Sequence, residues 1–323
     1  MVVATKVRKR VRPTAPDAPS PESAGKDEYL YLTGRPRLKT LIKFVKAHAV
    51  TPPQEATLTD LWHAAHKVVQ RLETEEAGIA DDPPRERLGP EYEPLLMEFF
   101  KDPLVRHGFN TVPTEVAMVE LDRLVVYQKH IDLTYVRQLE RELGPTPTDE
   151  QIFRACLLHE HSQPPAKWAR VRQDAFVFMS PSNDLRFLGV HPLETQHLKY
   201  DPPHGRPVGI VGLTVGFGSN FLNAIHAERR LVLNNGSHRA YTLRKLGVTH
   251  VPCVIQHASS REEVDVVAAQ EVRRDPDLCL KHPRPPMLKD YFNPDLFMIM
   301  PAYRRLRHVV VRFQVEEYAV PAL

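Results

Sequence analysis

The residues with the clearest capacity for chemistry form one short stretch, Asn235, Gly236, Ser237, His238 and Arg239. An apolar run at residues 231–233 precedes them and predicts a strand, and an Ala/Leu pattern at residues 240–246 predicts a helix behind them. A chain that turns from a strand into a helix directs unpaired backbone N–H groups at whatever lies above the turn. The spacing therefore predicts an anion-binding turn.

Each side chain of this turn contributes differently. Gly236 tolerates positive φ and leaves room for a phosphate against the backbone, and Ser237 offers a hydroxyl that can cap the helix. His238 can titrate or donate a hydrogen bond, and the planar guanidinium of Arg239 matches phosphate oxygens. The alternative from geometry alone is an ordinary capped turn with His and Arg on the surface.

A family resemblance favours the phosphate interpretation. Asn235-Gly-Ser-His-Arg239, the helix ending at Leu246-Gly247 and the run Val251-Pro-Cys-Val254 resemble the second box of the ParB/sulfiredoxin superfamily. Residues 119–128 resemble its first box, so the resemblance spans residues 116–256 with a large insertion, and nothing before residue 113 matches. The resemblance implies a nucleotide-phosphate site at Asn235, Gly236, Ser237, His238 and Arg239, with Gln128 and His130 as candidate contacts from the first box. A polar strand end is the alternative for those two.

Departures from the family patterns narrow the expected activity. Sulfiredoxins have a catalytic cysteine where this chain has Ser237, which disfavours sulfinic-acid reduction. Chromosome-partition ParB proteins have Glu-Arg-Arg after the glycine and a helix-turn-helix domain behind the fold, and this chain shows neither pattern. The relatives that remain are free-amino-acid kinases and nucleotide-hydrolysing members.

The resemblance therefore implies an ATP- or CTP-like nucleotide, bound with Mg²⁺, and phosphotransfer or hydrolysis with His238 and Ser237 as catalytic residues. Arg239 would neutralise developing charge, and Asp122 and Glu194 are the candidate carboxylates. The alternative is a non-catalytic ParB-like module that senses a nucleotide or binds DNA; a ParB-like nuclease is a weaker third option.

The surrounding pattern predicts an α+β chain in four parts: a disordered basic arm (1–28), a helical domain (29–112), a ParB/sulfiredoxin-like nucleotide-binding domain with an insertion (113–260), and a C-terminal helix, proline-rich turns and closing strand (261–323). Expected strands include residues 176–179, 208–215, 251–255 and 309–315. Helices are expected at 134–143, 148–159 and 261–272.

Composition excludes several classes of protein. The net charge is +3, but five positive charges lie within the first twelve residues, so the rest carries 38 − 40 = −2 and is not built to coat nucleic acid. The basic arm remains a candidate contact for DNA or an acidic partner. No apolar run spans a membrane and three scattered cysteines fit a reducing compartment, so a cytoplasmic location is expected. His159 and His161 are two residues apart and would lie on different faces of a helix, which disfavours a metal site there. Four arginines near the C-terminus form either a basic edge or a solvated strand face: Arg304, Arg305, Arg307 and Arg312.

Overall fold

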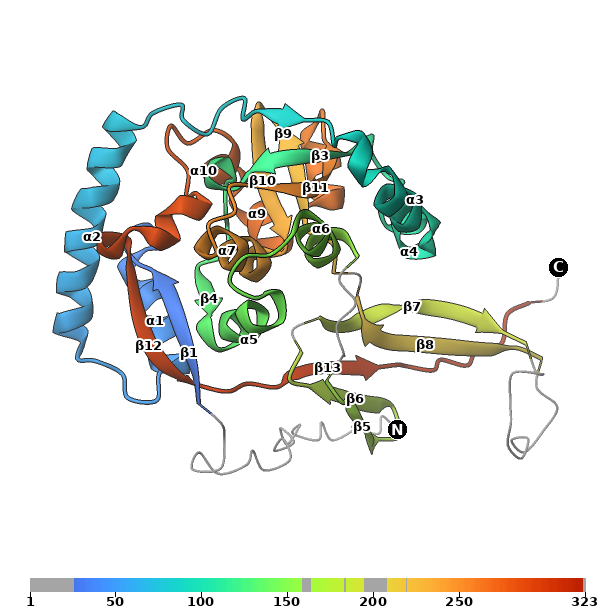
Figure 1. The fold of residues 1–323 in the computed structure, drawn as a ribbon. Helices are drawn as coiled ribbons and strands as arrows, with labels where there is room; N and C mark the ends of the chain where they lie inside the picture. The colour runs from blue at the N-terminus through green and yellow to red at the C-terminus, as the bar shows by residue number, and fades with distance from the viewer. Residues whose placement is uncertain (1–25, 159–163, 183, 195–207, 219, 322–323) are drawn as a thin grey trace.

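The computed structural model describes residues 26–158, 164–182, 184–194, 208–218 and 220–321 (Figure 1). Helices combine with several small sheets, so the chain has the α+β class that its sequence predicts. Within these ranges no helix has both the length and the apolar character that crossing a membrane requires. The predicted arm lies outside the described residues except for its last three, and so do His159 and His161.

A five-stranded sheet in the order β10-β9-β11-β3-β2 forms the centre of the fold. Its strands are β2 (Arg85–Glu86), β3 (Thr114–Glu120), β9 (Asn223–Ala227), β10 (Arg230–Asn235) and β11 (His250–His257). β11 runs antiparallel to β3 and parallel to β9. The chain passes from β10 to β11 through helix α7 (Ser237–Lys245), which places the predicted turn at the end of β10.

Three smaller sheets surround this centre. β12 (Phe297–Tyr303), β1 (Lys26–Leu32) and β4 (His130–Asp132) form an antiparallel sheet in that order. β13 (Arg307–Arg312), β6 (Ala175–Ser180) and β5 (Lys167–Arg172) form a second, and β7 (Leu185–Leu193) pairs with β8 (Ile210–Phe217) as a hairpin. The hairpin and the β13-β6-β5 sheet extend to one side of the body in Figure 1.

Helices cover the sheets and connect them. The α-helices besides α7 are α1 (Leu38–His48), α2 (Glu55–Glu75), α3 (Glu93–Lys101), α4 (Pro103–Gly108), α5 (Leu133–Leu143), α6 (Asp149–Leu157), α8 (Arg261–Val267), α9 (Gln270–Arg274) and α10 (Pro276–Leu280). Short 3₁₀ turns are η1 (Pro90–Tyr92), η2 (Leu121–Arg123), η4 (Leu288–Phe292) and η5 (Pro294–Leu296). α6 begins with a capping box between Thr148 and Gln151, which explains its well-defined start.

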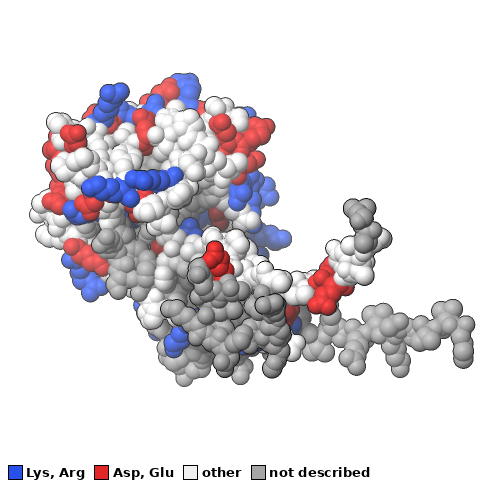
Figure 2. Space-filling view, turned by 90° about the vertical axis from the view of Figure 1, so that its right-hand side faces the viewer, with Lys and Arg blue, Asp and Glu red and all other residues white. Residues whose placement is uncertain are grey.

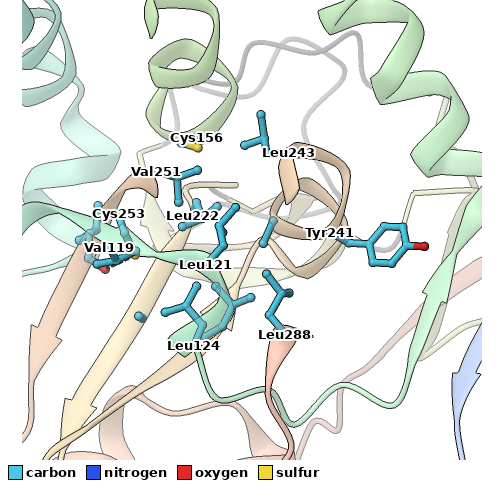
Figure 3. Close-up of a cluster of buried hydrophobic side chains, with 14 of the residues drawn as sticks. Val119, Leu121, Leu124, Cys156, Leu222, Tyr241, Leu243, Val251, Cys253 and Leu288 are labelled. Carbon is cyan, nitrogen blue, oxygen red and sulfur yellow. Dashed lines mark hydrogen bonds between the residues drawn. The ribbon is translucent and has the colours of Figure 1, made fainter. Parts of the chain in front are cut away.

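The largest core lies between the five-stranded sheet and helices α6 and α7 (Figure 3). Leu121, Leu222, Leu243 and Val251 are fully buried there. The same cluster includes Phe99 of α3, so the core extends across the predicted domain boundary at residue 112. Burial of this apolar surface is the main stabilising contribution to a fold of this size.

Two cysteines of this core have unreactive thiols. Cys156 and Cys253 are fully buried. Burial raises the pKa of the Cys156 thiol to about 12, because the thiolate would lose its hydration. Neither thiol is therefore a ready nucleophile at neutral pH.

The predicted helix at 261–272 is wrong as a single element, because the chain breaks between α8 and α9. Ala268, at the break, has an extended backbone. The side chain of Asn234 spans this break: its Nδ2 donates to the Val267 carbonyl over 3.2 Å, and its Oδ1 accepts from the Ala269 N–H at 2.9 Å. This long-range side chain supplies the hydrogen bonds that a continuous helix would have made internally.

A buried ion-pair cluster joins the C-terminal region to α2. Arg284, 1% exposed, donates through Nη1 and Nη2 to the two carboxylate oxygens of Asp290, over 2.7 and 2.5 Å. Its Nε donates to Glu76, just beyond α2, over 2.9 Å. A carboxylate oxygen of Asp290 also accepts from the Met287 N–H at 2.9 Å. The cluster thus fixes the proline-rich 283–286 segment against residues more than 200 positions earlier.

Candidate functional site

The turn between β10 and α7 depends on glycine. The β10–β9 register shifts between Leu233 and Asn235, and Gly236 then adopts φ +97° in the left-handed region. A Cβ at this position would lie 3.0 Å from Leu222 Cγ and 3.2 Å from Arg239 Nη2. Any other residue would therefore be strained and crowded.

The prediction that Ser237 caps α7 is wrong. Gly236 occupies the cap position and Ser237 is the first helical residue, so its hydroxyl is not placed to accept from the first turn. Ser237 is 6% exposed, and its Oγ makes no hydrogen bond with the described residues, yet it is not among the side-chain atoms sealed from solvent. The result is a nearly buried hydroxyl with unused hydrogen-bonding capacity.

The N-terminus of α7 also keeps its backbone donors. Within the described residues, no side chain caps the helix and no carbonyl accepts from the N–H groups of Ser237, His238 or Arg239. These groups carry the positive end of the helix dipole. The turn therefore has donors and positive potential but no protein acceptor among these residues.

Arg239 lies beneath the turn with its guanidinium turned inward. It is 2% exposed, and its Nη1 donates to the carbonyls of Ala155 and Cys156 at the end of α6, over 2.9 and 3.1 Å. Its Nη2 donates to Asn220 Oδ1 over 2.9 Å. No carboxylate forms an ion pair with it in the described ranges of the chain. Arg239 thus joins α6 to α7 and leaves a positive charge just below Gly236.

Asn220 connects the turn to the insertion. Its Oδ1 accepts from Arg239 and, at 3.5 Å, from Asn235 Nδ2. Its Nδ2 donates to Asp184 Oδ2 over 3.1 Å, and the Asp184 carbonyl accepts from the Gly218 N–H. Asp184 directly precedes β7 and Gly218 directly follows β8, so the base of the hairpin lies against the predicted site.

His238 is held neutral. Its Nε2 accepts from the Asp132 backbone N–H at 3.0 Å, which leaves a proton on Nδ1. Burial, with His130 and Arg239 as positive neighbours, lowers the pKa of His238 to about 3. The edge of the His238 ring contacts Tyr135, with ring centroids 5.6 Å apart. At neutral pH this side chain can donate through Nδ1, but its Nε2 is occupied.

The first-box candidates, Gln128 and His130, already have hydrogen-bonding or ring partners within the fold. Gln128 Nε2 donates to the His130 carbonyl over 2.9 Å, and the Gln128 carbonyl accepts from the Tyr291 hydroxyl. The His130 ring lies between Tyr29 and Phe44, with centroid distances of 5.2 and 5.3 Å. Burial, aided by His48, lowers the pKa of His130 to about 4. The structure therefore brings His130 close to the turn as a neutral ring within an aromatic cluster.

The two carboxylates proposed from the sequence do not meet at the turn. Asp122 pairs with Arg244 Nε over 2.8 Å, at the opposite end of α7. Glu194 follows β7, whose nine residues correspond to about 30 Å of extended chain from the hairpin base. Asp184 is the carboxylate that the Asn220 network does bring to the turn.

A metal ion would have few protein ligands here. Among the described residues, no three His, Cys, Asp or Glu side chains are grouped to hold one. Mg²⁺ bound with a nucleotide needs only one or two carboxylates, because phosphates and waters complete its shell. Asp184 meets that limited requirement, although its two oxygens already contact Arg186 and Asn220.

Sequence reasoning missed Asn220, Asp184 and Tyr135. The first two belong to the insertion, where no local pattern links them to the turn 15 or more residues later. Tyr135 follows the α5 cap Asp132, whose Oδ1 accepts from the N–H groups of Thr134 and Tyr135. Burial raises the pKa of Tyr135, and Arg239 opposes that shift. The Asp132 cap is the one sequence signal that places Tyr135 on the first turn of α5.

Comparison with known proteins gives no family assignment for this site. No family model, curated protein or solved structure matches the chain. The ParB/sulfiredoxin resemblance therefore rests on the residues quoted for it and stays a prediction. The charge, the donors and the buried hydroxyl of the turn are independent of that resemblance.

The lowered pKa values of His130 and His238 predict a loss of stability in acid. The folded pKa values are about 3 for His238 and about 4 for His130, and the unfolded pKa is about 6.5. At a pH between the folded and unfolded pKa values, each histidine binds a proton only when the protein unfolds. The free energy of unfolding should therefore fall as the pH decreases below about 6.5, by at most about 1.4 kcal/mol per pH unit for each histidine. Urea unfolding between pH 7.5 and 4.5 measures this slope.

The variant His130→Phe isolates one of the two groups. A phenyl ring preserves the contacts with Tyr29 and Phe44 but cannot bind a proton, so the slope should become shallower. His107→Phe on α4, where the imidazole is exposed, is the control. An unchanged slope in His130→Phe would contradict the assignment.

Proposed function

We propose that this protein binds a nucleotide through its phosphates at the turn between β10 and α7. One observation carries the proposal: the uncapped start of α7 combines three free backbone N–H groups with the nearly buried, unpartnered hydroxyl of Ser237. Backbone N–H groups and a hydroxyl that reach solvent together at a helix N-terminus form a ready binding site for an anion. A phosphate supplies acceptor oxygens and negative charge together.

The residues would have distinct roles in this site. The N–H groups and hydroxyl of Ser237, with the N–H of His238, would donate to phosphate oxygens, and Gly236 would leave space for them. Arg239 would act from below by charge and by holding α6 against α7, because its Nη1 already donates to two carbonyls. Neutral His238 would serve as a donor through Nδ1.

A nucleotide is favoured over a simple phosphate by the sequence resemblance. The order of a strand, a Gly-Ser-His-Arg turn, a helix and a Val-Pro strand is that of a ParB/sulfiredoxin-like domain, and β10, α7 and β11 follow this order. An ATP- or CTP-like ligand with Mg²⁺ is therefore the first choice, with Asp184 as the residue to hold the ion. Mg²⁺ would offset phosphate charge.

Phosphoryl transfer or hydrolysis is a second candidate function, favoured by one observation. Asp184 and the Tyr135 ring flank the turn, so a carboxylate and a phenol lie near the phosphate position. Non-catalytic nucleotide sensing needs neither group. Release of inorganic phosphate from a bound nucleotide distinguishes the two functions.

Changing Ser237 to Asp tests the site without weakening the helix. A carboxylate at the first helical position interacts favourably with the dipole, which offsets the cost of placing a charge at a position that is 6% exposed, so the fold should be preserved. The same charge should repel phosphate and reduce affinity for ATP and CTP at least tenfold, as the loss of charged hydrogen bonds requires. Isothermal titration calorimetry with each nucleotide, with and without Mg²⁺, measures the change.

Ser260→Asp is the matched control, because Ser260 caps α8 away from the turn and Asp is an equally good cap. It should bind nucleotide like the wild type. Equal affinity of Ser237→Asp and the wild type would show that phosphate does not bind at this turn.

A further inference from the structure

We infer that the three-stranded sheet β13-β6-β5 is a binding surface for single-stranded nucleic acid. This surface is distinct from the turn, and its composition is unusual. Its strands contain five Lys and Arg residues and no Asp or Glu. On the face of the molecule in Figure 2, by contrast, basic and acidic residues alternate over the body.

The strand register gathers aromatic side chains on one face of this sheet. Trp168 lies opposite Phe178, and Arg170 lies opposite Phe176. Directly opposed residues of antiparallel strands project to the same side, as do residues two apart. The rings of Trp168 and Phe178 stack with centroids 6.3 Å apart, and Phe176 and Phe313 stack at 6.4 Å. Trp168 is 65% exposed and Phe313 40%, so both ends of this aromatic row face solvent.

Two of the five positive charges share the aromatic face by register: Arg170 lies opposite Phe176, and Arg307 lies opposite Ser180, two residues from Phe178. The other three, Lys167, Arg172 and Arg312, lie opposite Met179 or Ala175 and so project to the other face of the sheet. None of the five belongs to an ion pair in the described part of the chain. The Arg170 guanidinium lies 5.8 Å from the Phe176 ring centroid, a cation–π contact that keeps it over the aromatic face.

This arrangement fits unpaired bases and a flanking phosphate backbone. Exposed rings can stack on bases only where those bases are not already stacked in a duplex, and cations beside them neutralise phosphates. A hollow of about 690 Å³ at the end of the sheet, lined by Gln173, Asp174, Arg312, Phe313, Gln314 and Val315, adds polar groups beside an aromatic ring. A second copy of this chain is a poor occupant, because pairing the two aromatic faces would oppose the Arg170 and Arg307 side chains of both copies.

Tryptophan fluorescence of the full chain tests the inference directly. The chain has two tryptophans, and Trp62 lies on α2 with its Nε1 donating to the Pro36 carbonyl, so Trp168 is the reporter on the sheet. A 20-nucleotide oligothymidylate should quench the emission, and a duplex of equal length should quench it far less. Trp168→Ala should abolish the quenching and weaken oligothymidylate binding, measured by fluorescence anisotropy, about tenfold. Phe100→Ala, which removes a 51% exposed ring on α3, should bind like the wild type.

Salt dependence tests the cations separately. Arg170→Ser/Arg307→Ser should reduce the slope of log affinity against log salt by about 1.4, since each phosphate contact on a single strand contributes about 0.7. The control Lys39→Ser/Lys43→Ser changes two exposed lysines elsewhere and should leave the slope unchanged. Binding without Trp168 quenching, and equal in Trp168→Ala, would assign nucleic acid to the N-terminal arm and overturn the inference. A dimer in sedimentation that Trp168→Ala dissociates would also overturn it.

Discussion

Replacing Arg239 with methionine is expected to lower the free energy of unfolding by about 2–5 kcal/mol, because buried acceptors lose a charged donor. Methionine fills much of the same volume but donates no hydrogen bond. The Ala155 carbonyl and the Oδ1 of Asn220 would lose their guanidinium donor, whereas the Cys156 carbonyl would keep the Leu222 N–H at 2.8 Å. Each unpaired buried acceptor costs about 1–3 kcal/mol. Urea unfolding at pH 7.5, followed by circular dichroism, measures the effect.

Arg244→Met is the control for this variant, because Arg244 lies on the last turn of the same helix. Its ion pair with Asp122 is about one-third exposed on both sides, so its loss should cost at most about 1 kcal/mol. Comparable losses in the two variants would show that the buried guanidinium of Arg239 is not what joins α6 to α7.

Replacing Arg284 with methionine is expected to have an effect of similar size, about 3–5 kcal/mol. Asp290, 4% exposed in its side chain, would retain its charge, and among the described residues the Met287 N–H would be its remaining hydrogen-bond donor, with Arg35 as a positive neighbour. Glu76 would keep Lys289, 2.8 Å away, so the loss concentrates at Asp290. The same urea assay measures it.

A double variant separates the charge from the packing. Arg284→Met/Asp290→Leu removes both partners, so it should be more stable than Arg284→Met alone, because no buried carboxylate is left unpaired. Arg154→Met is the surface control; its pairs with Glu98 and Glu150 are exposed and should contribute at most about 1 kcal/mol. A double variant no more stable than the single one would contradict this account.

Local elements could be predicted from the sequence because local physics specifies them. The apolar spacing at Val136 and Leu139 marks α5, and the Asn-Gly turn at 235–236 correctly separates a strand from a helix. The sequence favours Ser237 as the cap of α7 because serine is the commoner capping residue. The bulge at the end of β10 instead makes Gly236, in the left-handed conformation, the cap residue. β1 and β12 went unpredicted because they are stabilised by pairing with each other from opposite ends of the chain.

The turn residues of the site could be predicted from the sequence, but their tertiary partners could not. The turn residues are contiguous, so their capacity for anions follows from their types and order. The direction of the Arg239 guanidinium does not, because its partners at Ala155, Cys156 and Asn220 lie 19 to 84 positions away. The pairing of Asp122 with Arg244 is likewise a tertiary contact that removes a candidate no local pattern could exclude.

Asn220 has a further consequence as a shared hydrogen-bonding partner. One amide serves the turn through Arg239 and Asn235 and the hairpin base through Asp184. The next residue after Asp184, Leu185, accepts from Arg307 of β13 at 3.4 Å. A ligand that displaces Asn220 from the turn would also change its hydrogen bond with Asp184 at the hairpin base, and thermodynamic linkage makes such an effect on binding reciprocal. The turn and the insertion therefore share one hydrogen-bonding side chain.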